Sequence, residues 1–495
     1  MEIYYRSTRG GGERVSASQA ILRGIAEDGG LYVPEKLPVF GRPVRDFAGM
    51  SYRETAMAIL SLLLTDYTAE ELQHCVDSAY DDKFDTEAIA PITEACGAYY
   101  LELWHGATIA FKDMALSILP HLMTTAAKKN GRTEKIVILT ATSGDTGKAA
   151  LAGFADVPGT GIVVFYPKDG VSPVQKLQMV TQRGDNTCAV GIEGNFDDAQ
   201  TGVKKLFTDE RVRGELAAAG YVFSSANSIN IGRLVPQIVY YVYSYATLLR
   251  EGKIKDGDEI DIVVPTGNFG NILAAYYARA MGLPVKTLIC ASNENRVLYD
   301  FFGTGAYDRN REFILTSSPS MDILISSNLE RLIYHIAGDD ADKDRELMAK
   351  LLSEGRYEIT PSMREQLTMF HGGFATEEET LAEIGRVYRQ AHYLIDTHTA
   401  VASAVYAAYR EKTGDATPTV IASTASPFKF PRAVAQAIDV PADGDDDLAL
   451  AAKLAEVTGR TLPKAVRELS SAPVRHTGIC AIDGMEQAVK GFLKI

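Results

Sequence analysis

From residue 98 onward the chain repeats one pattern, in which a short run of β-branched or aromatic residues precedes an amphipathic helical stretch. The runs are apolar at nearly every position, as in parallel strands that are buried on both faces. This alternation predicts βαβ units and an open α/β architecture, whose ligands bind beyond the carboxyl ends of the strands. The expected strands are 99–103, 135–140, 161–166, 187–191, 221–225, 259–265, 285–291 and 419–423.

The length of the chain predicts more than one domain. A chain of 495 residues is too long for a single hydrophobic core and indicates roughly two to four domain-sized units. Residues 300–395 lose the strand–helix alternation, and we interpret them as a mostly helical insertion. The expected division is an N-terminal lobe at 1–95, a large domain at 96–135 and 232–495 that includes the insertion, and a small domain at 136–231.

The sequence predicts helical structure in three particular stretches. Residues 363–370 and 377–389 have the clearest helical pattern within the expected insertion. The stretch 111–129 is also helical in pattern, but it contains Pro120. Because proline removes a backbone donor and clashes with the preceding turn, we expect a kink or a new helix start there.

Composition disfavours several classes of function. A hydrophobic content of 46% and a charged content of 23% are typical of a soluble globular protein, and no apolar run is long enough to span a membrane. The net charge of -14 disfavours nucleic acid as a partner, because the chain has no basic stripe. The five cysteines lack C-x-x-C spacing, so disulfides and metal sites are not expected. No signal peptide is visible, so we expect a cytoplasmic location. We also expect a monomer or a homodimer.

A single lysine in an apolar setting is the strongest candidate for chemistry. Lys112 follows an apolar run and precedes Asp113 within the stretch 105–113. Burial lowers the pKa of a lysine, and a neutral amine is what forms a Schiff base with a carbonyl group. The alternative is a lysine at a helix start that extends its ammonium into solvent, which is the commoner situation for such a stretch taken alone.

A hydroxyl-rich loop follows the second expected strand. Residues 141–148 read Ala-Thr-Ser-Gly-Asp-Thr-Gly-Lys and open a helix, whose free N–H groups and positive dipole suit a carboxylate or a phosphate. The ending resembles that of a nucleotide-binding P-loop, but Thr142 stands where that motif has glycine and Ala149 where it has Ser or Thr. Nucleotide hydrolysis is therefore disfavoured, and a plain capped helix start is the alternative.

Two further strand-end loops combine small residues with polar side chains. In residues 265–271, two glycines three positions apart let backbone amides converge on an anion, with Asn268 and Asn271 as added donors. Residues 226–233 gather three short polar side chains and the guanidinium of Arg233, a set that suits a dianion. The alternatives are an ordinary Gly-Asn turn for the first loop and a capped helix with a surface arginine for the second.

Three shorter segments carry weaker signals. Hydroxyl groups at 423–426 follow the last expected strand, where they either bond a heterocyclic nitrogen or close the turn. Residues 6–9, followed by three glycines, are either an anion site or a mobile terminus. His398 stands two residues after Asp396, and we interpret it as structural, with catalysis as the alternative.

Taken together, six motifs resemble those of the threonine synthases, in their longer bacterial and fungal branch. The resemblance spans most of the chain and implies the tryptophan-synthase-β fold type (pyridoxal-phosphate fold type II), with open, mostly parallel sheets in two cofactor-binding lobes and an added N-terminal lobe. The motifs are Tyr4-Tyr5-Arg6-Ser7-Thr8-Arg9-Gly10, His105-Gly106-x-Thr108-x-Ala110-Phe111-Lys112-Asp113, Ser143-Gly144-Asp145-Thr146-Gly147, Asn227-Ser228-x-Asn230-x-x-Arg233, Gly267-Asn268-Phe269-Gly270-Asn271 and Ser423-Thr424-Ala425.

The resemblance implies a role for each motif. Lys112 would hold pyridoxal 5'-phosphate through a Schiff base and then move protons. Thr424 would hydrogen-bond the pyridine nitrogen through a neutral hydroxyl, which leaves that nitrogen less protonated than an aspartate would. The implied phosphate-binding residues of the cofactor are Gly267, Asn268, Phe269, Gly270 and Asn271. The implied substrate-binding residues are Thr142, Ser143, Gly144, Asp145, Thr146, Asn227, Ser228 and Arg233.

Two separate phosphate sites distinguish the implied substrate. Asn227, Ser228 and Arg233 would hold the phosphate of O-phospho-L-homoserine, which reacts with water to give L-threonine and phosphate. Many fold relatives have asparagine at the position of Asp145, so direct contact of this carboxylate with a ligand is left open. The alternatives are a serine or threonine dehydratase or a β-replacement synthase, for which one phosphate site suffices, and a non-catalytic phosphate-binding relative.

Overall fold

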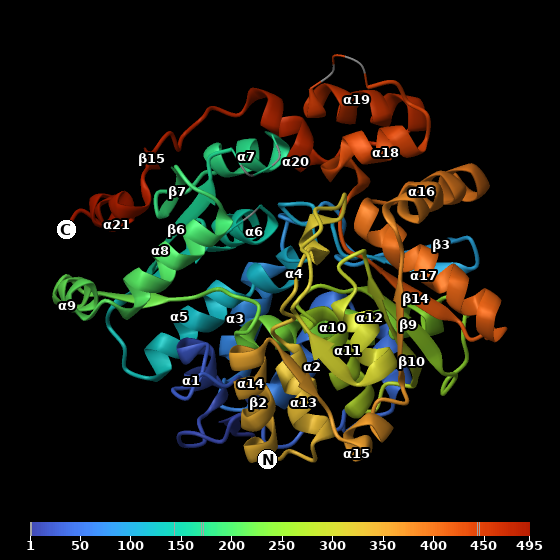
Figure 1. Cartoon of the computed structure of the whole chain (residues 1–495), viewed down its shortest axis with the longest axis horizontal. Helices are drawn as coiled ribbons and strands as arrows, with labels where there is room; N and C mark the ends of the chain where they lie inside the picture. Colours follow the sequence, from blue (N-terminus) through green and yellow to red (C-terminus); the bar gives the residue numbers. More distant parts are fainter. Residues whose placement is uncertain (1, 143, 170, 172, 443, 445) are drawn as a thin grey trace.

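Two sheets organise the chain (Figure 1). The computed structural model describes residues 2–142, 144–169, 171, 173–442, 444 and 446–495. One sheet has six strands in the order β13-β10-β9-β14-β4-β3, and the other has five in the order β15-β7-β6-β5-β8. Ser143 lies outside the described residues, so its expected contact with substrate stays a prediction.

The six-stranded sheet is parallel except at one edge. Its parallel strands are β13 (Phe370–Phe374), β10 (Val285–Ser292), β9 (Ile260–Pro265), β14 (Thr419–Ser423) and β4 (Ala98–Glu102), and β3 (Ile92–Ala95) pairs antiparallel with β4.

Helices cover both faces of this sheet, which explains why its central strands are apolar throughout. Ile421 of β14 lies between Val263 of β9 and Tyr100 of β4, and these three side chains pack with α17 (Thr397–Thr413). Their neighbours along each strand point to the opposite face and pack with α11 (Gly270–Ala280) and α12 (Val297–Thr304). A strand buried on both faces has no polar side to alternate with.

The five-stranded sheet is parallel throughout. Its strands are β15 (Ile479–Cys480), β7 (Thr187–Ile192), β6 (Thr160–Pro167), β5 (Lys135–Ala141) and β8 (Tyr221–Ser224). One face packs with α6 (Asp145–Phe154), and the other packs with α8 (Phe196–Thr208) and α21 (Met485–Leu493).

The last segment of the chain crosses to the second sheet, where β15 pairs with β7 (Figure 1). The sequence had predicted that this segment belongs with the first sheet, in the large domain at 232–495. Its position on the second sheet has a physical reason, since α21 buries Met485 and Val489 against α8 and the strands of that sheet. The remaining domain bounds stay a prediction.

The N-terminal segment packs onto the six-stranded half of the molecule. It contains an antiparallel pair, β1 (Tyr5–Ser7) and β2 (Tyr32–Pro34), and three helices that each begin with a capping box. Those helices are α1 (Ala17–Arg23), α2 (Tyr52–Leu63) and α3 (Ala69–Ala79). Helix α2 packs against α10 (Ile231–Arg250), and α1 packs against α5 (Leu119–Lys129).

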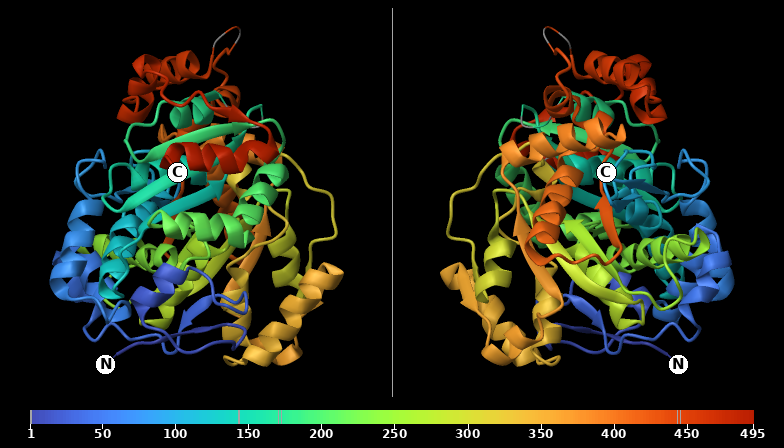
Figure 2. Two further views of the ribbon diagram at one scale, coloured as in Figure 1. Left: turned by 90° about the vertical axis from the view of Figure 1, so that its left-hand side faces the viewer. Right: turned by 90° about the vertical axis from the view of Figure 1, so that its right-hand side faces the viewer.

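Residues 6–9 form an internal contact in place of the mobile terminus considered above. Arg9 donates to both carboxylate oxygens of Glu330, at 3.0 and 2.8 Å, and Thr8 donates to the same group at 2.6 Å. Glu330 lies on α13 (Leu329–Ile336), so the first strand docks against the segment after residue 300, as Figure 2 shows for the blue and orange parts of the chain. The charge of Arg9 is neutralised by this pair.

The expected elements are largely present. All eight strands lie within one residue of their expected bounds. Helix α4 (Asp113–Leu116) stops before Pro120, which stands in the first turn of α5, so the predicted restart is confirmed. Helix α16 (Glu377–Ala391) confirms the prediction at 377–389.

The helix expected at 363–370 is wrong. Helix α15 (Pro361–Glu365) is followed by a turn and then by β13, which adds a sixth strand to the first sheet. Local propensity did not indicate this strand because it contains Gly372 and Gly373. Tertiary packing explains why glycine stands in this strand, since a Cβ at Gly373 would lie 2.4 Å from Val405 of α17.

The remaining elements complete the layers and connections. These elements are η1 (Val44–Gly49), α7 (Pro173–Val180), α9 (Glu210–Ala218), β11 (Ala306–Asp308), η2 (Pro319–Met321), α14 (Ala341–Glu354), β12 (Arg356–Glu358), η3 (Pro427–Lys429), α18 (Pro431–Ala437), α19 (Asp447–Thr458), α20 (Lys464–Arg467), η4 (Glu468–Ser471) and η5 (Ile482–Gly484).

Among the described residues, no helix combines the length and the apolar character that crossing a lipid bilayer requires.

Candidate active site

The loop that carries Lys112 is fixed against the loop that follows β14. The backbone N–H of Phe111 donates to the carbonyl of Thr424 at 2.8 Å, and the N–H of Ser426 donates to the carbonyl of Ile109 at 3.1 Å. Lys112 precedes α4 directly. Two motifs that are more than 300 positions apart in the sequence are therefore held side by side at the carboxyl ends of β4 and β14.

The side chain of Lys112 is largely buried, with 12% exposed, and its ammonium points to protein groups. Its Nζ donates to Oγ of Ser320 at 3.3 Å, lies 3.7 Å from Oδ2 of Asp145, and sits 4.8 Å from the ring centre of Phe111. Burial lowers the pKa of Lys112 to about 8, although the negative charge of Asp145 opposes this shift. A substantial fraction of the amine is therefore neutral near physiological pH.

Asp145, in the first turn of α6, has partners on both carboxylate oxygens. Oδ1 lies 2.8 Å from Nζ of Lys429 and accepts from Nε2 of Gln175 at 2.9 Å, and Oδ2 accepts from Oγ of Ser320 at 2.9 Å. Burial raises the pKa of this carboxyl, but the ammoniums of Lys429 and Lys112 outweigh burial and hold the pKa well below its usual range. Asp145 is thus an anion that bonds to protein groups.

The two other titratable residues of the lysine motif, Asp113 and His105, are held by hydrogen bonds. Asp113 accepts from the N–H of Thr108 at 2.8 Å and from its hydroxyl at 2.6 Å, and burial raises the pKa of Asp113. His105 lies between the carboxylates of Asp85 and Glu102, at 2.6 and 2.8 Å. Burial opposes the charged form, but these carboxylates raise the pKa of His105 to about 9.

The loop between β9 and α11 has the form of an anion cradle. Phe269 has a left-handed backbone with φ of 64°, which turns the chain into α11. A Cβ on Gly267 would lie 2.6 Å from the carbonyl oxygen of Ser320, so the loop requires glycine there. Asn328 donates to the carbonyl of Asn268 through its backbone and its side chain, both at 3.0 Å.

Asn271 supplies a buried donor without a protein partner at this loop. Its Oδ1 accepts from the hydroxyl of Tyr241, while Nδ2 is buried and makes no hydrogen bond within the described structure. An orphaned buried donor is costly unless a ligand satisfies it. The loop at 265–271 therefore fits a phosphate group.

Arg233, in the first turn of α10, is a buried cation and not the surface arginine of the alternative interpretation. Its side chain donates to the carbonyl of Ala226 at 3.0 Å, and its Nε is buried without a partner in the described structure. Among the described residues, no carboxylate lies within 4 Å of its guanidinium. Burial lowers the pKa of Arg233 to about 10. A charged, unpaired guanidinium of this kind fits a phosphate.

The neighbours of Arg233 in the motif differ in role. Asn230 caps α10, since its Oδ1 accepts from the N–H of Gly232 at 2.8 Å and its Nδ2 donates to Ile21 at 2.9 Å. Asn227 is exposed and Ser228 is half-buried, so both side chains are accessible to a ligand.

The loop before α6 is shaped by Thr142. Its hydroxyl accepts from the N–H groups of Gly144 and Gly147, at 2.9 and 3.0 Å, which fixes the start of the helix. A Cβ on Gly144 would lie 2.5 Å from Gln175, so a side chain would close this loop. Thr146 is half-buried and accessible. Thr142 thus acts as a cap, and the accessible groups of the loop lie after it.

Three side chains at the site were not predicted from the sequence to belong to it. Ser320 on η2 comes from the expected insertion and contacts Lys112. Lys429 on η3 is fully buried and donates to the carbonyl of Thr108 at 3.1 Å as well as pairing with Asp145. His398 accepts from the N–H of Ser320 at 3.1 Å. Of the three, only His398 could have been noticed in the sequence, because it stands two residues after Asp396.

Buried positive charge exceeds buried negative charge around Lys112. The charges that act on its amine come from Asp145, Lys429, Arg233 and Asp113. Lys148, a further buried lysine with a pKa lowered by burial to about 8, acts on Asp113 and Lys429. Four cations against two carboxylates favour an anionic ligand.

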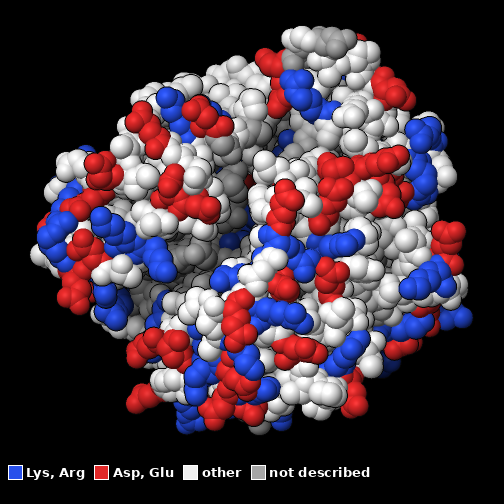
Figure 3. All heavy atoms as spheres, viewed as in Figure 1, with Lys and Arg blue, Asp and Glu red and all other residues white. Residues whose placement is uncertain are grey.

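The surface around this region is hollowed. Figure 3 shows a depression between the half that holds β6 and β7 and the half that holds the six-stranded sheet, with blue atoms at its depth. Acidic and basic side chains alternate on the face shown, without a continuous basic stripe.

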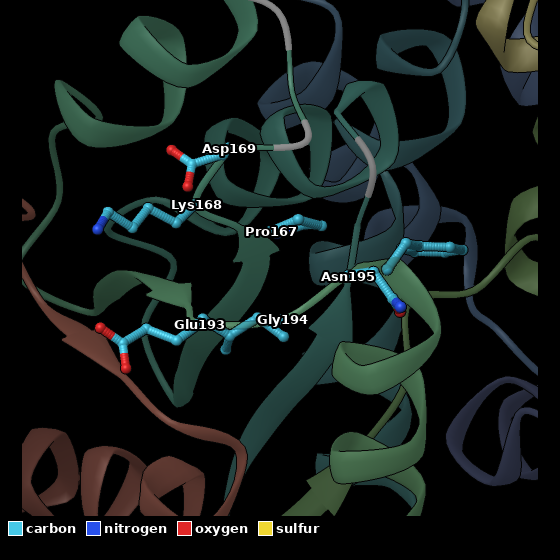
Figure 4. Close-up of a pocket in the computed structure, with 8 residues that line it drawn as sticks. Pro167, Lys168, Asp169, Glu193, Gly194 and Asn195 are labelled. Atoms are coloured by element: carbon cyan, nitrogen blue, oxygen red, sulfur yellow. The ribbon is translucent and has the colours of Figure 1, made fainter.

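A separate cavity of about 610 Å³ lies at the carboxyl ends of β6 and β7 (Figure 4). Lys168 and Glu193 extend there in the same direction, away from Asn195 at the start of α8. None of its lining residues belongs to the motifs above. They are Pro167, Lys168, Asp169, Ile192, Glu193, Gly194, Asn195 and Phe196.

Comparison with known families agrees with the site. Residues 89–425 match the family model described as "Pyridoxal-phosphate dependent enzyme". Residues 4–80 match "Threonine synthase N terminus", and residues 399–489 match "Threonine synthase, C-terminal". The pyridoxal-phosphate model thus covers Lys112, Arg233, the glycine loop and Thr424.

Individual proteins extend this result. The chain is 41% identical to human "Threonine synthase-like 1" over 86% of its own length, but it spans only 59% of that protein. It is 36% identical to threonine synthase of Schizosaccharomyces pombe, with 89% of this chain and 90% of the relative covered. The structure of pyridoxal-phosphate-bound threonine synthase from Brucella melitensis superposes with a TM-score of 0.86 at 36% identity, with both chains fully covered at 100%. The chain therefore belongs to the threonine synthase family of pyridoxal-phosphate-dependent enzymes.

Proposed function

We propose that this chain is a threonine synthase, which converts O-phospho-L-homoserine and water to L-threonine and phosphate. One observation carries the proposal: Nδ2 of Asn271 and Nε of Arg233, two buried donors that have no partner among the described residues, accompany the largely buried amine of Lys112. The two donors stand in the first turns of separate helices, α11 after β9 and α10 after β8. A pyridoxal-phosphate enzyme whose substrate is itself phosphorylated requires two phosphate sites.

The residues of the site fit pyridoxal 5'-phosphate. Lys112 would bind its aldehyde, the loop Gly267, Asn268, Phe269, Gly270 and Asn271 would bind its phosphate, and Thr424 would face its ring nitrogen. When bound, the cofactor supplies an electron sink that stabilises negative charge on the substrate carbon skeleton.

The side chains of this chain divide the remaining work. Arg233, with Asn227 and Ser228, would bind the substrate phosphate and stabilise it as it departs, because a buried guanidinium interacts strongly with a dianion. The N–H groups of Asp145 and Thr146, which do not bond to Thr142, would bind the α-carboxylate at the positive end of α6. The amine of Lys112, with its lowered pKa, would take the proton from Cα and return a proton later in the reaction.

A turnover assay with two readouts tests the proposal. The chain loaded with pyridoxal phosphate and given O-phospho-L-homoserine should release phosphate and threonine in equal amounts. Release of a keto acid in place of threonine would favour a dehydratase. A visible absorbance band that borohydride removes, with the label on Lys112, is expected, and a colourless chain that cannot be reconstituted would favour a non-catalytic relative.

Arg233→Ala separates the substrate phosphate from the cofactor phosphate. We expect turnover of O-phospho-L-homoserine to fall by a factor of about 100 or more, the usual cost of a lost charged contact, while the cofactor band is retained. The matched control is Arg213→Ala, which removes an exposed guanidinium on α9. If Arg233→Ala binds O-phospho-L-homoserine as well as the control does, the assigned phosphate grip is wrong.

We also propose that the chain has the large and small domains given above, is a monomer or a homodimer, and is cytoplasmic. Light scattering of the purified chain measures the oligomeric state.

A further inference from the structure

A fully buried lysine and a largely buried one share one carboxylate at this site. Nζ of Lys429 lies 2.8 Å from Oδ1 of Asp145, while Nζ of Lys112 lies 3.7 Å from Oδ2 of the same residue. The three residues come from η3, from the loop before α4 and from the first turn of α6. One carboxylate thus faces two ammonium groups, and the shorter of the two ion pairs is the one that Lys429 makes.

Lys429 is buried to a degree that requires compensation. Its side chain is 0% exposed, and its contacts are the carbonyl of Thr108 and the carboxylate of Asp145. Transfer of an ammonium from water to a protein interior is expensive unless a counterion and hydrogen bonds replace the water. The nearby cation Lys148 differs in this respect, since its Nζ donates to the neutral side chain of Gln182 at 2.5 Å.

We propose that Lys429 is a positioning residue that occupies the Asp145 carboxylate, so that Lys112 has no carboxylate in direct contact and gives up its proton more readily. The inference deepens the proposed function, because it depends on Lys112 being the cofactor lysine. It also assigns Asp145 a role: the carboxylate acts on Lys112 through its charge and is held away from an anionic substrate.

The geometry accounts for the direction of the effect. An ammonium with a carboxylate in direct contact keeps its proton, because the ion pair is lost on deprotonation. At Lys112 the hydroxyl of Ser320 stands between the two groups, since it accepts from Nζ at 3.3 Å and donates to Asp145 at 2.9 Å. The other charges that act on the amine are those of Lys429, Arg233 and Asp113.

Competitive labelling of the full chain, freed of pyridoxal phosphate, tests this role without using activity. Acetic anhydride modifies only neutral amines, so the pH dependence of Lys112 labelling gives its pKa. In Lys429→Met, the carboxylate is left with Lys112 as its cation, and the pKa of Lys112 should rise by about one unit, a roughly tenfold loss of neutral amine. In Asp145→Asn, the pKa of Lys112 should fall.

The double variant shows whether Lys429 acts through Asp145. When Asp145→Asn is already present, Lys429→Met should move the pKa of Lys112 by less than half as much as it does in the wild-type background. If Lys429→Met does not fold, the double variant still carries the test, because it leaves neither a buried carboxylate nor a buried ammonium without its partner, and the pKa of its Lys112 should lie below the wild-type value. An unchanged pKa of Lys112 in Asp145→Asn would overturn the inference.

Lys148→Met is the matched control. It removes a buried ammonium of the same charge that pairs with Gln182, and we expect the pKa of Lys112 to stay the same. A rise as large as that in Lys429→Met would show that total positive charge, and not the pairing with Asp145, sets the proton affinity. Labelling needs neither substrate nor turnover. A result that overturns the role of Lys429 is therefore distinguishable from a result that overturns the proposed threonine synthase activity.

Discussion

Nε2 of His398 accepts a hydrogen bond of 3.1 Å from the backbone N–H of Ser320, which stands 78 positions earlier in the chain. On the other side of the ring, Nδ1 lies 2.7 Å from Oδ2 of Asp396, the cap of α17. The carboxylate fixes the tautomer in which Nδ1 carries the proton and Nε2 accepts. A helix start is thereby linked to the serine that contacts Lys112.

Replacement of His398 by leucine should destabilise the fold and disturb the lysine. His398→Leu leaves the N–H of Ser320 without its acceptor, at a cost of about 1–3 kcal/mol for an unsatisfied group, and removes one of the partners of Asp396. We expect a lower free energy of unfolding in urea and slower growth of the cofactor absorbance band. His74→Leu, on the exposed face of α3, is the control. Equal stability of the two variants would contradict this assignment.

A methyl group at Gly267 should prevent cofactor binding. In Gly267→Ala the added Cβ would lie 2.6 Å from the carbonyl oxygen of Ser320, so either the phosphate loop or η2 must move. Titration with pyridoxal phosphate should show an affinity at least about tenfold weaker, equivalent to 1.4 kcal/mol or more.

The same substitution elsewhere provides the comparison. At Gly214, within α9, an added Cβ would have no described atom within 4 Å apart from the neighbouring backbone of its own helix. Gly214→Ala should raise stability by about 0.5–1 kcal/mol, because alanine favours a helix interior. If both alanine variants bind pyridoxal phosphate alike, the close approach of Gly267 to Ser320 has no functional consequence.

His105 should make a pH-dependent contribution to stability. Its pKa rises from 6.5 to about 9 in the folded protein. A raised folded-state pKa stabilises fully below the unfolded value, and this contribution is lost as pH increases through 9. His105→Gln should therefore cost on the order of 3 kcal/mol at pH 6 and much less at pH 10.

Urea unfolding of both chains at the two pH values measures this difference. A cost that is the same at pH 6 and pH 10 would show that the histidine contributes through packing and not through its charge.

The rate at which Lys112 reacts with pyridoxal phosphate should follow its lowered pKa. With the pKa of Lys112 at about 8, the neutral fraction rises roughly 50-fold between pH 6 and pH 8 and levels off above about pH 9. Stopped-flow absorbance of the cofactor-free chain gives the profile. A rate that still climbs tenfold between pH 9 and pH 10 would indicate an ordinary, exposed lysine.

The sequence was sufficient for those parts of the fold that repeat or that depend on local chemistry. Strands such as β9 and β14 are apolar at each position because helices cover both faces, and this pattern is visible without the structure. Pro120 marked the start of α5 because its ring excludes continuation of a helix. The glycine loop after β9 was found because it joins a strand to a helix.

Residues that act through distant contacts had no such signal. Lys429 resembles any lysine in the sequence, and only the fold brings it to Asp145, 284 positions away. Ser320 lies in a region without periodicity, and Gly372 and Gly373 reduced the strand propensity of β13. Burial of Arg233 was also hidden, because an arginine after a capped helix start is usually exposed.

The pairing of β15 with β7 has a consequence for the behaviour of the chain outside the active site. Without residues 479 and 480, β7 would be the border of the second sheet, with a row of N–H and C=O groups open to any passing strand. Helix α21 holds this short strand in place through Met485 and Val489. Loss of that helix would therefore expose a template for intermolecular β-pairing, and the chain would aggregate while its catalytic groups were still intact.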